Sequence, residues 1–211
     1  MRNRNWIFDL DDTLHHASGG IFAHISHAMS AYMMKHLQVD AVEARLLRER
    51  YWAQYGATMH GLVTHHNIDP HDFLLETHKL DELEQWLFAE HNLAESLRAL
   101  PGRKVIFSNG PHHYVTGILQ RLAIERHFHS IYGVEQLDYV PKPHISAFRK
   151  VLAQERLDPR HCIMVEDSLP NLLTAKKLGM KTIWVSKQVR RPAHVDIRVA
   201  SIGELARRRW D

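Results

Sequence analysis

The chain is short of cysteine and of long apolar runs, and each shortage excludes a class of protein. Cys162 is its single cysteine, so the chain can form neither an internal disulfide nor a metal site built from cysteines. The apolar residues 163–165 that follow it predict a buried structural thiol. No apolar run approaches the roughly 18 residues of a membrane-spanning helix. Residues 1–5 contain no signal-peptide core, so we expect a cytoplasmic protein.

An excess of charge of one sign is also lacking. The 27 Lys and Arg residues nearly balance the 24 Asp and Glu residues, which gives a formal net charge of +3. This balance favours anionic partners only slightly and does not identify a nucleic-acid-binding protein. The densest basic clusters, 190–191 and 207–209, are predicted to be solvated surface. The 18 histidines include adjacent pairs, but those pairs lack the i,i+4 spacing of a helical metal site.

The sequence does contain a regular alternation of short apolar runs, polar turns and amphipathic segments. Residues 6–8 form an uninterrupted apolar triplet, which is typical of a strand covered on both faces. The later predicted strands are 104–107, 163–165 and 182–185, and the helices between and after them are 112–122, 145–155 and 170–178. This alternation predicts an α/β fold with a Rossmann-like, three-layer core, in which a parallel sheet lies between helices.

A long helical segment separates the first two predicted strands. Helices are predicted over 21–37 and 41–55, from Pro70 onward, and over 81–100. A segment of this length is too long to be a simple crossover between neighbouring strands. We therefore expect a helical cap domain, residues 14–97, inserted into a sheet core made of residues 1–13 and 98–211.

Three carboxylates follow the first predicted strand closely. Asp9, Asp11 and Asp12 repel one another at this spacing unless a cation offsets their charge, and a divalent metal is the simplest such cation. Because Asp9 and Asp11 are separated by one residue, they can point to the same side of the strand end. One could then attack a substrate while the other transfers protons. The alternative is that Asp11, Asp12 and Thr13 only form a polar turn and cap the next helix.

Polar and charged residues also follow the later strands. Ser108 and Asn109 end the second strand, Lys142 lies in a loop between two prolines, and Glu166 and Asp167 end a further strand. Each also has an ordinary explanation. Ser108 and Asn109 could cap a helix, Lys142 could be an ordinary loop lysine, and Glu166 and Asp167 could be the acidic start of a helix. In a parallel sheet, however, all of them gather with the first carboxylates at one edge. Together they supply a nucleophile, an acid/base, neutral donors, a cation and metal ligands, which predicts a phosphate-processing site.

The motifs FDLDDT (8–13), SN (108–109), PKP (141–143) and VEDS (165–168) resemble, in this order, those of the haloacid dehalogenase superfamily of phosphatases. The resemblance implies that Asp9 attacks phosphorus to form an aspartyl-phosphate, while Asp11 protonates the leaving oxygen and later activates water. It also implies that Ser108 and Lys142 hold the phosphoryl oxygens. The dehalogenases of the superfamily lack the second Asp of the first motif, so Asp11 favours phosphate chemistry over dehalogenation.

The same resemblance implies a magnesium cofactor. The Mg²⁺ ligands would be the side chains of Asp9 and Asp167, the backbone carbonyl of Asp11, and Glu166 either directly or through water. A hard cation with oxygen ligands suits a site of carboxylates and phosphate that has no cysteine. We therefore expect Mg²⁺ as the cofactor.

A narrower resemblance concerns the substrate. The stretches TLHHASGGIF (13–22), YWAQYGATMHGL (51–62) and LPGRKVIFSNGPHHYVTGILQRL (100–122) are similar to the pyrimidine 5′-nucleotidase branch, whose members dephosphorylate nucleoside monophosphates such as UMP. The chain departs from that branch where His15 replaces a common Tyr and where Glu166 begins a pair that is usually two aspartates. The predicted substrate contacts are Ser108, Asn109, Lys142 and His15 in the core, and Tyr55, Thr58 and His60 in the cap.

We expect a phosphomonoesterase that acts on a small phosphorylated metabolite, a pyrimidine nucleoside monophosphate. A sugar-phosphate phosphatase or phosphomutase on the same scaffold is the second interpretation. A third is a regulatory or nucleic-acid-binding protein that keeps the site only for structure. The basic residues 207–209 motivate it, but the sequence has no recognition-helix or aromatic-platform pattern. No membrane partner is expected, and the sequence leaves the oligomeric state open.

Overall fold

The computed structural model describes residues 4–210, and the centre of the fold is a parallel sheet. Its strands are β1 (Asn5–Phe8), β2 (Arg103–Phe107), β3 (Ser130–Tyr132), β4 (Cys162–Glu166), β5 (Lys181–Val185) and β6 (Ile197–Val199). They lie in the order β3-β2-β1-β4-β5-β6, and every neighbouring pair is parallel. The α/β class predicted from the sequence is therefore confirmed.

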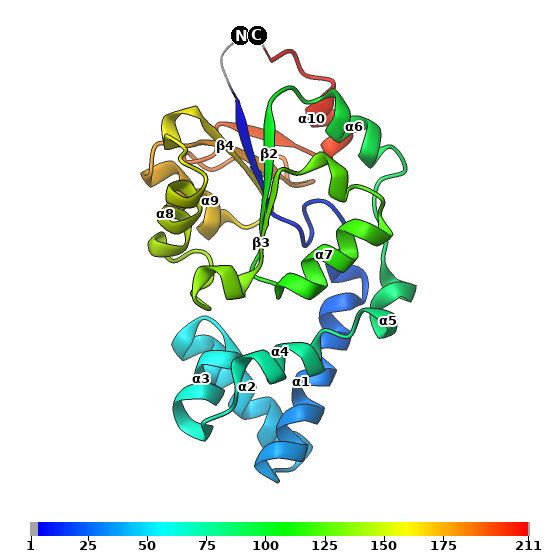
Figure 1. Ribbon diagram of the computed structural model, residues 1–211, viewed down its shortest axis with the longest axis vertical. Coiled ribbons are helices and arrows are strands. Elements are labelled where there is room, and N and C mark those ends of the chain that lie inside the picture. Colours follow the sequence, from blue (N-terminus) through cyan, green and yellow to red (C-terminus); the bar gives the residue numbers. More distant parts are fainter. Residues whose placement is uncertain (1–3, 211) are drawn as a thin grey trace. The chain divides into compact units, whose positions relative to one another are not determined.

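Strand β1 lies near the centre of the sheet because both of its faces are apolar. Trp6, Ile7 and Phe8 are each at most 1% exposed, and β1 pairs with β2 on one side and with β4 on the other. A strand that is apolar on both faces needs a covering layer on each side of the sheet. Figure 1 shows α8 and α9 on one face of the sheet and α7 on the other, which gives the three predicted layers.

The helices around the sheet bury their apolar faces against it. They are α6 (Leu93–Ala99), α7 (His112–Arg121), α8 (Ile145–Gln154), α9 (Leu169–Lys177) and α10 (Ile202–Ala206), with short 3₁₀ turns η3 (Glu125–His127), η4 (Val134–Leu137) and η5 (Pro159–His161). One core cluster joins Phe148 of α8 and Leu172 of α9 to Ile7 and Phe107 of the sheet. The rings of Phe107 and Phe148 meet edge to face, with centroids 4.9 Å apart. Burial of each such side chain stabilises the fold by roughly 1.5–3 kcal/mol.

A second compact unit, Ala17–Leu87, consists of helices, whereas the first unit comprises the residues up to His16 together with those from Phe88 onward. Its elements are η1 (Ala17–Gly19), α1 (Ile21–Leu37), α2 (Ala41–Tyr55), α3 (Thr58–His66), α4 (Pro70–Thr77), α5 (Leu80–Leu83) and η2 (Glu84–Trp86). Gly56 ends α2 with a φ of 75°, a left-handed conformation that glycine adopts without strain. Helices α2 and α3 approach so closely that a Cβ atom on Gly61 would overlap the ring of Tyr51.

The predicted continuous helix over 81–100 is not observed. Helix α5 ends at Leu83, η2 follows, and helical structure resumes only with α6 at Leu93. Helix α6 packs on α10 in the first unit, and the carboxylate of Glu90 accepts hydrogen bonds from the backbone N–H groups of Ile202 and Gly203. The compact helical unit spans Ala17–Leu87, and these contacts hold the residues after it against the sheet unit. The wider cap domain expected over 14–97 stays a prediction.

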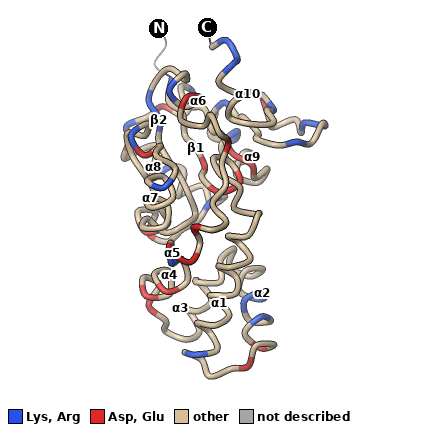
Figure 2. The backbone as a smooth tube through the Cα atoms, turned by 90° about the vertical axis from the view of Figure 1, so that its right-hand side faces the viewer, with Lys and Arg blue, Asp and Glu red and all other residues tan. Residues whose placement is uncertain are grey.

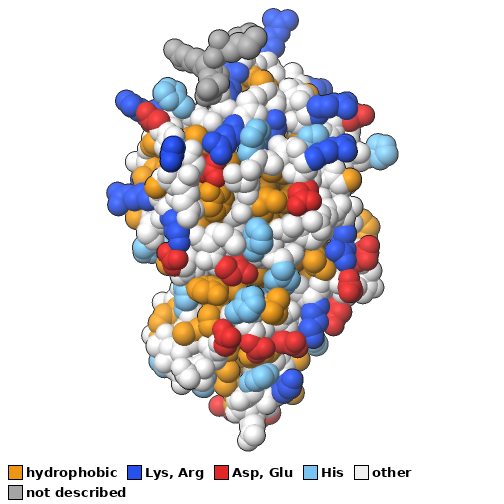
Figure 3. Space-filling model, viewed as in Figure 1, with side chains coloured by type: hydrophobic (Ala, Val, Ile, Leu, Met, Phe, Trp, Pro, Cys, Tyr) orange, Lys and Arg blue, Asp and Glu red, His pale blue; other side chains and the backbone are white. Residues whose placement is uncertain are grey.

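Charged side chains of both signs are interspersed over the surface. Segments with Lys or Arg and segments with Asp or Glu are scattered along the chain in Figure 2, and the face in Figure 3 also carries many histidines. The two arginine clusters of the sequence, 190–191 and 207–209, are exposed, as predicted. None of the helices within residues 4–210 is both long enough and apolar enough to cross a membrane.

Candidate active site

The candidate site lies where three neighbouring strands end. Asp9 follows β1 directly, Ser108 follows β2, and Glu166 is the last residue of β4. Phe8 at the end of β1 is in register with Ile106 of β2 and Val165 of β4, so the polar residues that follow lie side by side. This is the edge at which parallel sheets bind their ligands.

Lys142 comes from the loop before α8 and inserts its ammonium group among the strand-end carboxylates. Its Nζ lies 2.6 Å from Oδ1 of Asp9 and 2.8 Å from Oε2 of Glu166. All three side chains are at least 92% buried. Burial alone would lower the pKa of Lys142, but the negative charges of Asp9 and Glu166 outweigh it and raise that pKa above its usual value. The lysine is therefore a fixed positive charge in the centre of the site.

The carboxylates hold more negative charge than this lysine balances. Burial, together with the charge of Glu166, raises the pKa of Asp9 to about 7. Burial also raises the pKa of Glu166, and it raises that of Asp167 to about 6. One cation thus serves three buried or half-buried acids, and their ionised forms need further positive charge.

The arrangement of these acids fits a bound divalent cation. Asp9, Glu166 and Asp167 each offer one carboxylate oxygen, and these oxygens all lie within 4.8 Å of one another. Oxygen donors of this kind suit a hard cation, and a cation would offset the negative charge of these acids, whose pKa values are raised chiefly by burial. The residues present therefore fit a metal centre of the kind that the sequence predicts.

Two side chains hold Asp11 at the same edge. The hydroxyl of Tyr114, on α7, donates to Oδ1 of Asp11 at 2.5 Å, and Nε2 of His15 lies 2.9 Å from the same oxygen. Asp11 and His15 also form a backbone bridge, which folds the turn between them back on itself. Burial and the nearby Asp11 raise the pKa of Tyr114 well above its usual value, so its hydroxyl keeps the proton that it donates. The predicted contact of His15 with substrate stays a prediction, whereas its contact with Asp11 is observed.

The structure adds contacts for residues at the strand ends that the sequence did not suggest. The hydroxyl of Thr13 donates to Oδ2 of Asp9 at 3.1 Å. The only feature of the sequence that could have indicated this contact is that Thr13 lies four residues after Asp9. Asn109 binds the backbone of Lys142, because its Nδ2 donates to the carbonyl at 3.0 Å and its Oδ1 accepts from the N–H at 2.8 Å. Ser108 is fully buried, and its Oγ accepts from the N–H of Gly110. Whether Ser108 and Asn109 also contact substrate stays a prediction.

The predicted cap residues all lie in the helical unit. Tyr55 ends α2, and its hydroxyl lies 2.7 Å from Nε2 of His65. Thr58 begins α3, is buried, and donates to the backbone carbonyl of Arg48 at 3.4 Å. His60 is half-buried on the same helix. The three residues are thus close in sequence at the junction of α2 and α3, and their contact with substrate stays a prediction.

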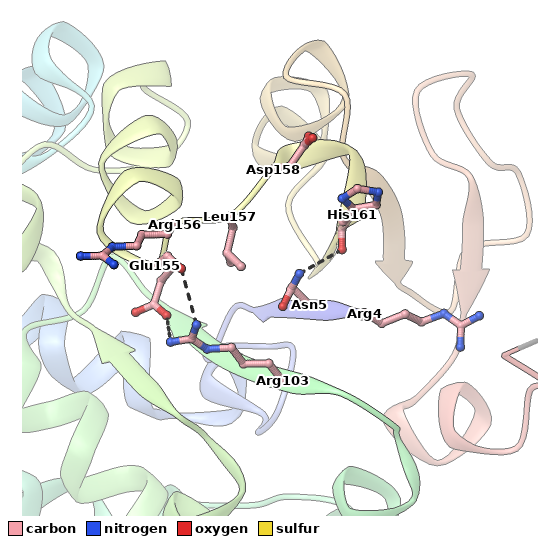
Figure 4. A pocket seen from close by; sticks show the side chains of 8 residues that line it. All are labelled: Arg4, Asn5, Arg103, Glu155, Arg156, Leu157, Asp158 and His161. Carbon is pink, nitrogen blue, oxygen red and sulfur yellow. Dashed lines mark hydrogen bonds and ion pairs between the residues drawn. The ribbon is translucent and has the colours of Figure 1, made fainter. Parts of the chain in front are cut away.

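A cavity of about 420 Å³ lies at the other edge of the sheet. Asn5 and Arg103, which begin β1 and β2, line it together with Glu155, Arg156 and His161. Figure 4 shows the ion pair between Arg103 and the carboxylate of Glu155. It also shows the hydrogen bond from the side-chain amide of Asn5 to the backbone carbonyl of His161. Because the strands begin here and the carboxylate cluster lies where they end, this cavity is separate from the candidate active site.

Comparison with known proteins gives relatives along almost the whole chain. A glyceraldehyde 3-phosphate phosphatase of Pyrococcus furiosus is 29% identical over 197 residues, which cover 84% of this chain and 78% of that protein. A 5′-nucleotidase of Pseudomonas aeruginosa is 26% identical over 207 residues, which cover 88% of this chain and 83% of that protein.

Solved structures share the same fold at lower identity. A HAD phosphatase from Thermococcus onnurineus superposes with a TM-score of 0.65 at 18% identity, covering 96% of this chain and 95% of that one. A magnesium-bound HAD hydrolase of Bacillus subtilis gives a TM-score of 0.66 at 15% identity and covers 97% of both chains. The family model described as haloacid dehalogenase-like hydrolase matches residues 6–185. That match includes every strand-end motif described above, and the chain belongs to the haloacid dehalogenase-like hydrolase family.

Proposed function

We propose that this chain, a phosphatase of the haloacid dehalogenase-like family, hydrolyses pyrimidine nucleoside 5′-monophosphates with Mg²⁺ as its cofactor. The observation that carries the proposal is the buried position of Lys142 Nζ, within 2.8 Å of both Asp9 and Glu166. A fixed cation beside a carboxylate at the end of a central strand is suited to a phosphoryl group, whose negative charge it balances.

The residues divide the chemistry between two carboxylates. An oxygen of Asp9 attacks phosphorus, the bond from phosphorus to the ester oxygen breaks, and Asp11 gives its proton to that leaving oxygen. In the second half, water attacks the aspartyl-phosphate, Asp11 takes the proton from the water, and the bond to Asp9 breaks to release phosphate. Lys142 stays charged throughout and holds the phosphoryl oxygens against Asp9, with Ser108 as a neutral donor.

Metal ligation falls to the acids that the structure brings together. Asp9 and Asp167 would hold Mg²⁺ with their side chains, assisted by Glu166 and by the backbone carbonyl of Asp11. When bound, the ion would supply positive charge that offsets these carboxylates and the phosphoryl group. Asp167 supports this assignment, because its carboxylate oxygen lies within 4.8 Å of those of Asp9 and Glu166, and burial raises its pKa, so its ionised form needs positive charge nearby.

The choice of substrate rests on the relatives and on the stretches similar to pyrimidine 5′-nucleotidases. One relative is named a 5′-nucleotidase, and it matches 88% of the chain. Tyr55, Thr58 and His60 are the proposed base or sugar contacts from the helical unit. Thr58 is the weakest of them, because its side chain is buried and already donates to a backbone carbonyl.

A small sugar or triose phosphate is the second candidate substrate. Two relatives named glyceraldehyde 3-phosphate phosphatase, from Pyrococcus furiosus and Pyrococcus abyssi, are each 29% identical over 84% of the chain. A phosphomutase on the same scaffold would instead conserve the phosphoester, so release of inorganic phosphate from glucose 1-phosphate separates the two activities.

A panel of phosphate esters tests the proposal. Phosphate release from UMP, CMP, AMP, glyceraldehyde 3-phosphate and glucose 1-phosphate is measured with Mg²⁺ and with EDTA. We expect kcat/KM to be at least about tenfold higher for UMP and CMP than for the others, and activity to disappear in EDTA. Comparable rates on all esters would defeat the nucleotidase assignment but not the phosphatase one.

A matched pair of Asp variants identifies the nucleophile. Asp9→Asn should abolish turnover while the protein remains folded, because an amide cannot form the acyl-phosphate. Asp158 lies in the wall of the cavity at the other edge of the sheet. The Asp158→Asn variant should therefore release phosphate as fast as the unmodified protein. Full activity of Asp9→Asn would remove the proposed nucleophile.

A further inference from the structure

Two side chains from distant parts of the chain converge on one oxygen of Asp11. Tyr114 lies 103 residues after Asp11, and its hydroxyl is 2.5 Å from Oδ1. His15 lies one turn after Asp11, and its Nε2 is 2.9 Å from the same Oδ1. A single oxygen therefore receives two of the contacts that hold this carboxyl group.

Both partners are more deeply buried than the group they hold. The side chain of His15 is 0% exposed and Tyr114 is 1% exposed, whereas the side chain of Asp11 is 17% exposed. The other ring nitrogen of His15, Nδ1, is buried and has no hydrogen-bond partner within residues 4–210. A buried donor without an acceptor is costly, so the ring proton belongs on Nε2, where it points at Asp11.

The two donors restrict where Asp11 can carry a proton. A carboxyl oxygen has two lone pairs, and the hydrogen bonds from Tyr114 and His15 occupy both of those on Oδ1. A proton on the carboxyl group is then left to the second oxygen, Oδ2. The same bonds prevent rotation of the group, because rotation would exchange the two oxygens and break both contacts.

We propose that Tyr114 and His15 are positioning residues that hold Oδ1 of Asp11, so that Oδ2 is the atom that exchanges protons with the leaving group. This inference rests on the proposed function, in which Asp11 protonates the ester oxygen and then accepts a proton from water. Neither residue touches the phosphoryl group in this assignment. Their effect reaches the reaction only through the orientation of Asp11, and it should matter only when the leaving group needs a proton.

The dependence on leaving group gives a test that a purely structural role would not pass. Benzyl phosphate releases a basic alkoxide that needs protonation, whereas 2,4-dinitrophenyl phosphate releases an anion that is stable without it. Release of the leaving group in a single turnover isolates the first chemical step from hydrolysis of the aspartyl-phosphate. In Tyr114→Phe and His15→Met, we expect this step to slow roughly 10- to 100-fold with benzyl phosphate and less than about threefold with 2,4-dinitrophenyl phosphate.

Two further variants separate positioning from folding. His15→Gln keeps an N–H donor near the place of Nε2, so it should stay within about threefold of the unmodified protein on both esters. Tyr132→Phe is a matched control, because the hydroxyl of Tyr132 is also buried and donates at 2.5 Å to a carboxylate, that of Glu155. It should lose a similar amount of thermal stability to Tyr114→Phe but leave the ratio of the two rates unchanged.

The outcomes separate this inference from the function on which it rests. Equal losses on both esters in Tyr114→Phe and His15→Met, or no loss on either, would overturn the positioning role while the phosphatase assignment stands. Failure of the unmodified protein to release phosphate from either ester would overturn the proposed function and this inference together. A selective loss on benzyl phosphate, restored in His15→Gln and absent in Tyr132→Phe, is the result that we expect.

Discussion

Nζ of Lys142 lies 2.6 Å from Oδ1 of Asp9, although 133 residues separate them in the sequence. The same nitrogen lies 2.8 Å from Oε2 of Glu166. One ammonium group thus separates two buried carboxylates that would otherwise repel each other. Because all three side chains are buried, water cannot replace the lysine if it is removed.

Replacing Lys142 with Met should destabilise the metal-free protein in a way that depends on pH. The change leaves Asp9 and Glu166 buried without their cation, so we expect the free energy of unfolding at pH 8 to fall by about 3–5 kcal/mol. At pH 5.5 the loss should be smaller, because burial raises the pKa of Asp9 to about 7, and this acid can then take up a proton and become neutral. Urea denaturation in EDTA at the two pH values measures both losses, and phosphatase activity should be lost with the lysine.

Lys104 is a matched control for this prediction. It is also buried in the same unit, but its Nζ donates to the backbone carbonyl of Leu100 at 2.7 Å, and burial lowers its pKa. Lys104→Met should cost about 1–2 kcal/mol at both pH values, the effect of a lost hydrogen bond, and should keep activity. If the two variants lose stability equally and with the same pH dependence, the lysine does not act as the counter-ion of Asp9 and Glu166.

Stability of the metal-free protein should fall as pH rises from about 4 to about 7. The pKa is raised to about 7 for Asp9 and to about 6 for Asp167, chiefly by burial, and the usual value for Asp is about 3.9. In this window the folded protein therefore binds more protons than the unfolded chain. The free energy of unfolding falls as pH rises and those protons leave. Mg²⁺ favours the ionised acids, so it should raise the urea midpoint more at pH 8 than at pH 5.

Asp9→Asn provides the control for this pH dependence. The amide does not titrate, so the urea midpoint of the variant in EDTA should fall less between pH 5 and pH 8 than that of the unmodified protein. Its gain from Mg²⁺ should also be smaller, because one ligand is weakened. Identical pH profiles of the two proteins in EDTA would show that Asp9 does not carry the raised pKa.

Much of the fold could be predicted because its signals are local. Helix α2 has the predicted bounds 41–55, since an N-cap Asp and a C-terminal Gly enclose it. The apolar triplet 6–8 is the core of β1, and the three predicted strand-end motifs meet because neighbouring parallel strands end at one edge. Strands β3 and β6 were missed because each has only three residues, which is too short for a periodic pattern.

The contacts within the site could not be predicted from the same signals. The sequence places Lys142 in a loop, but its contact with Asp9 depends on the path of that loop through space. In the sequence, Tyr114 resembles any other apolar residue of an amphipathic helix. Its hydrogen bond to Asp11 joins residues that are 103 positions apart, so no local pattern indicates it. The break after Leu83 was missed because 81–100 keeps an amphipathic pattern, whereas the contacts of Glu90 with α10 are tertiary.

Removal of the Thr13 hydroxyl should slow formation of the aspartyl-phosphate. Its Oγ1 donates to Oδ2 of Asp9 at 3.1 Å, which fixes the rotation of the attacking carboxylate. Thr13→Val keeps the volume but not the donor, and we expect kcat to fall about tenfold, equivalent to about 1.4 kcal/mol of barrier, with little change in KM. Thr13→Ser keeps the donor and should stay within about threefold. A Thr13→Ser variant as slow as Thr13→Val would point to packing of the methyl group instead.

The two hydrogen bonds between Asn109 and the backbone of Lys142 should control how firmly the lysine is held. Asn109→Ala removes both bonds, at 3.0 Å and 2.8 Å, so the backbone N–H of Lys142 loses its acceptor. We expect its hydrogen exchange to accelerate at least about tenfold, and kcat to fall, because the ammonium group is then less fixed beside Asp9. Asn5→Ala is the matched control, since the Asn5 amide binds the backbone of His161 at the other edge of the sheet. Exchange at Lys142 that stays slow in Asn109→Ala would show that the loop is held by other contacts, and kcat should then be unchanged as well.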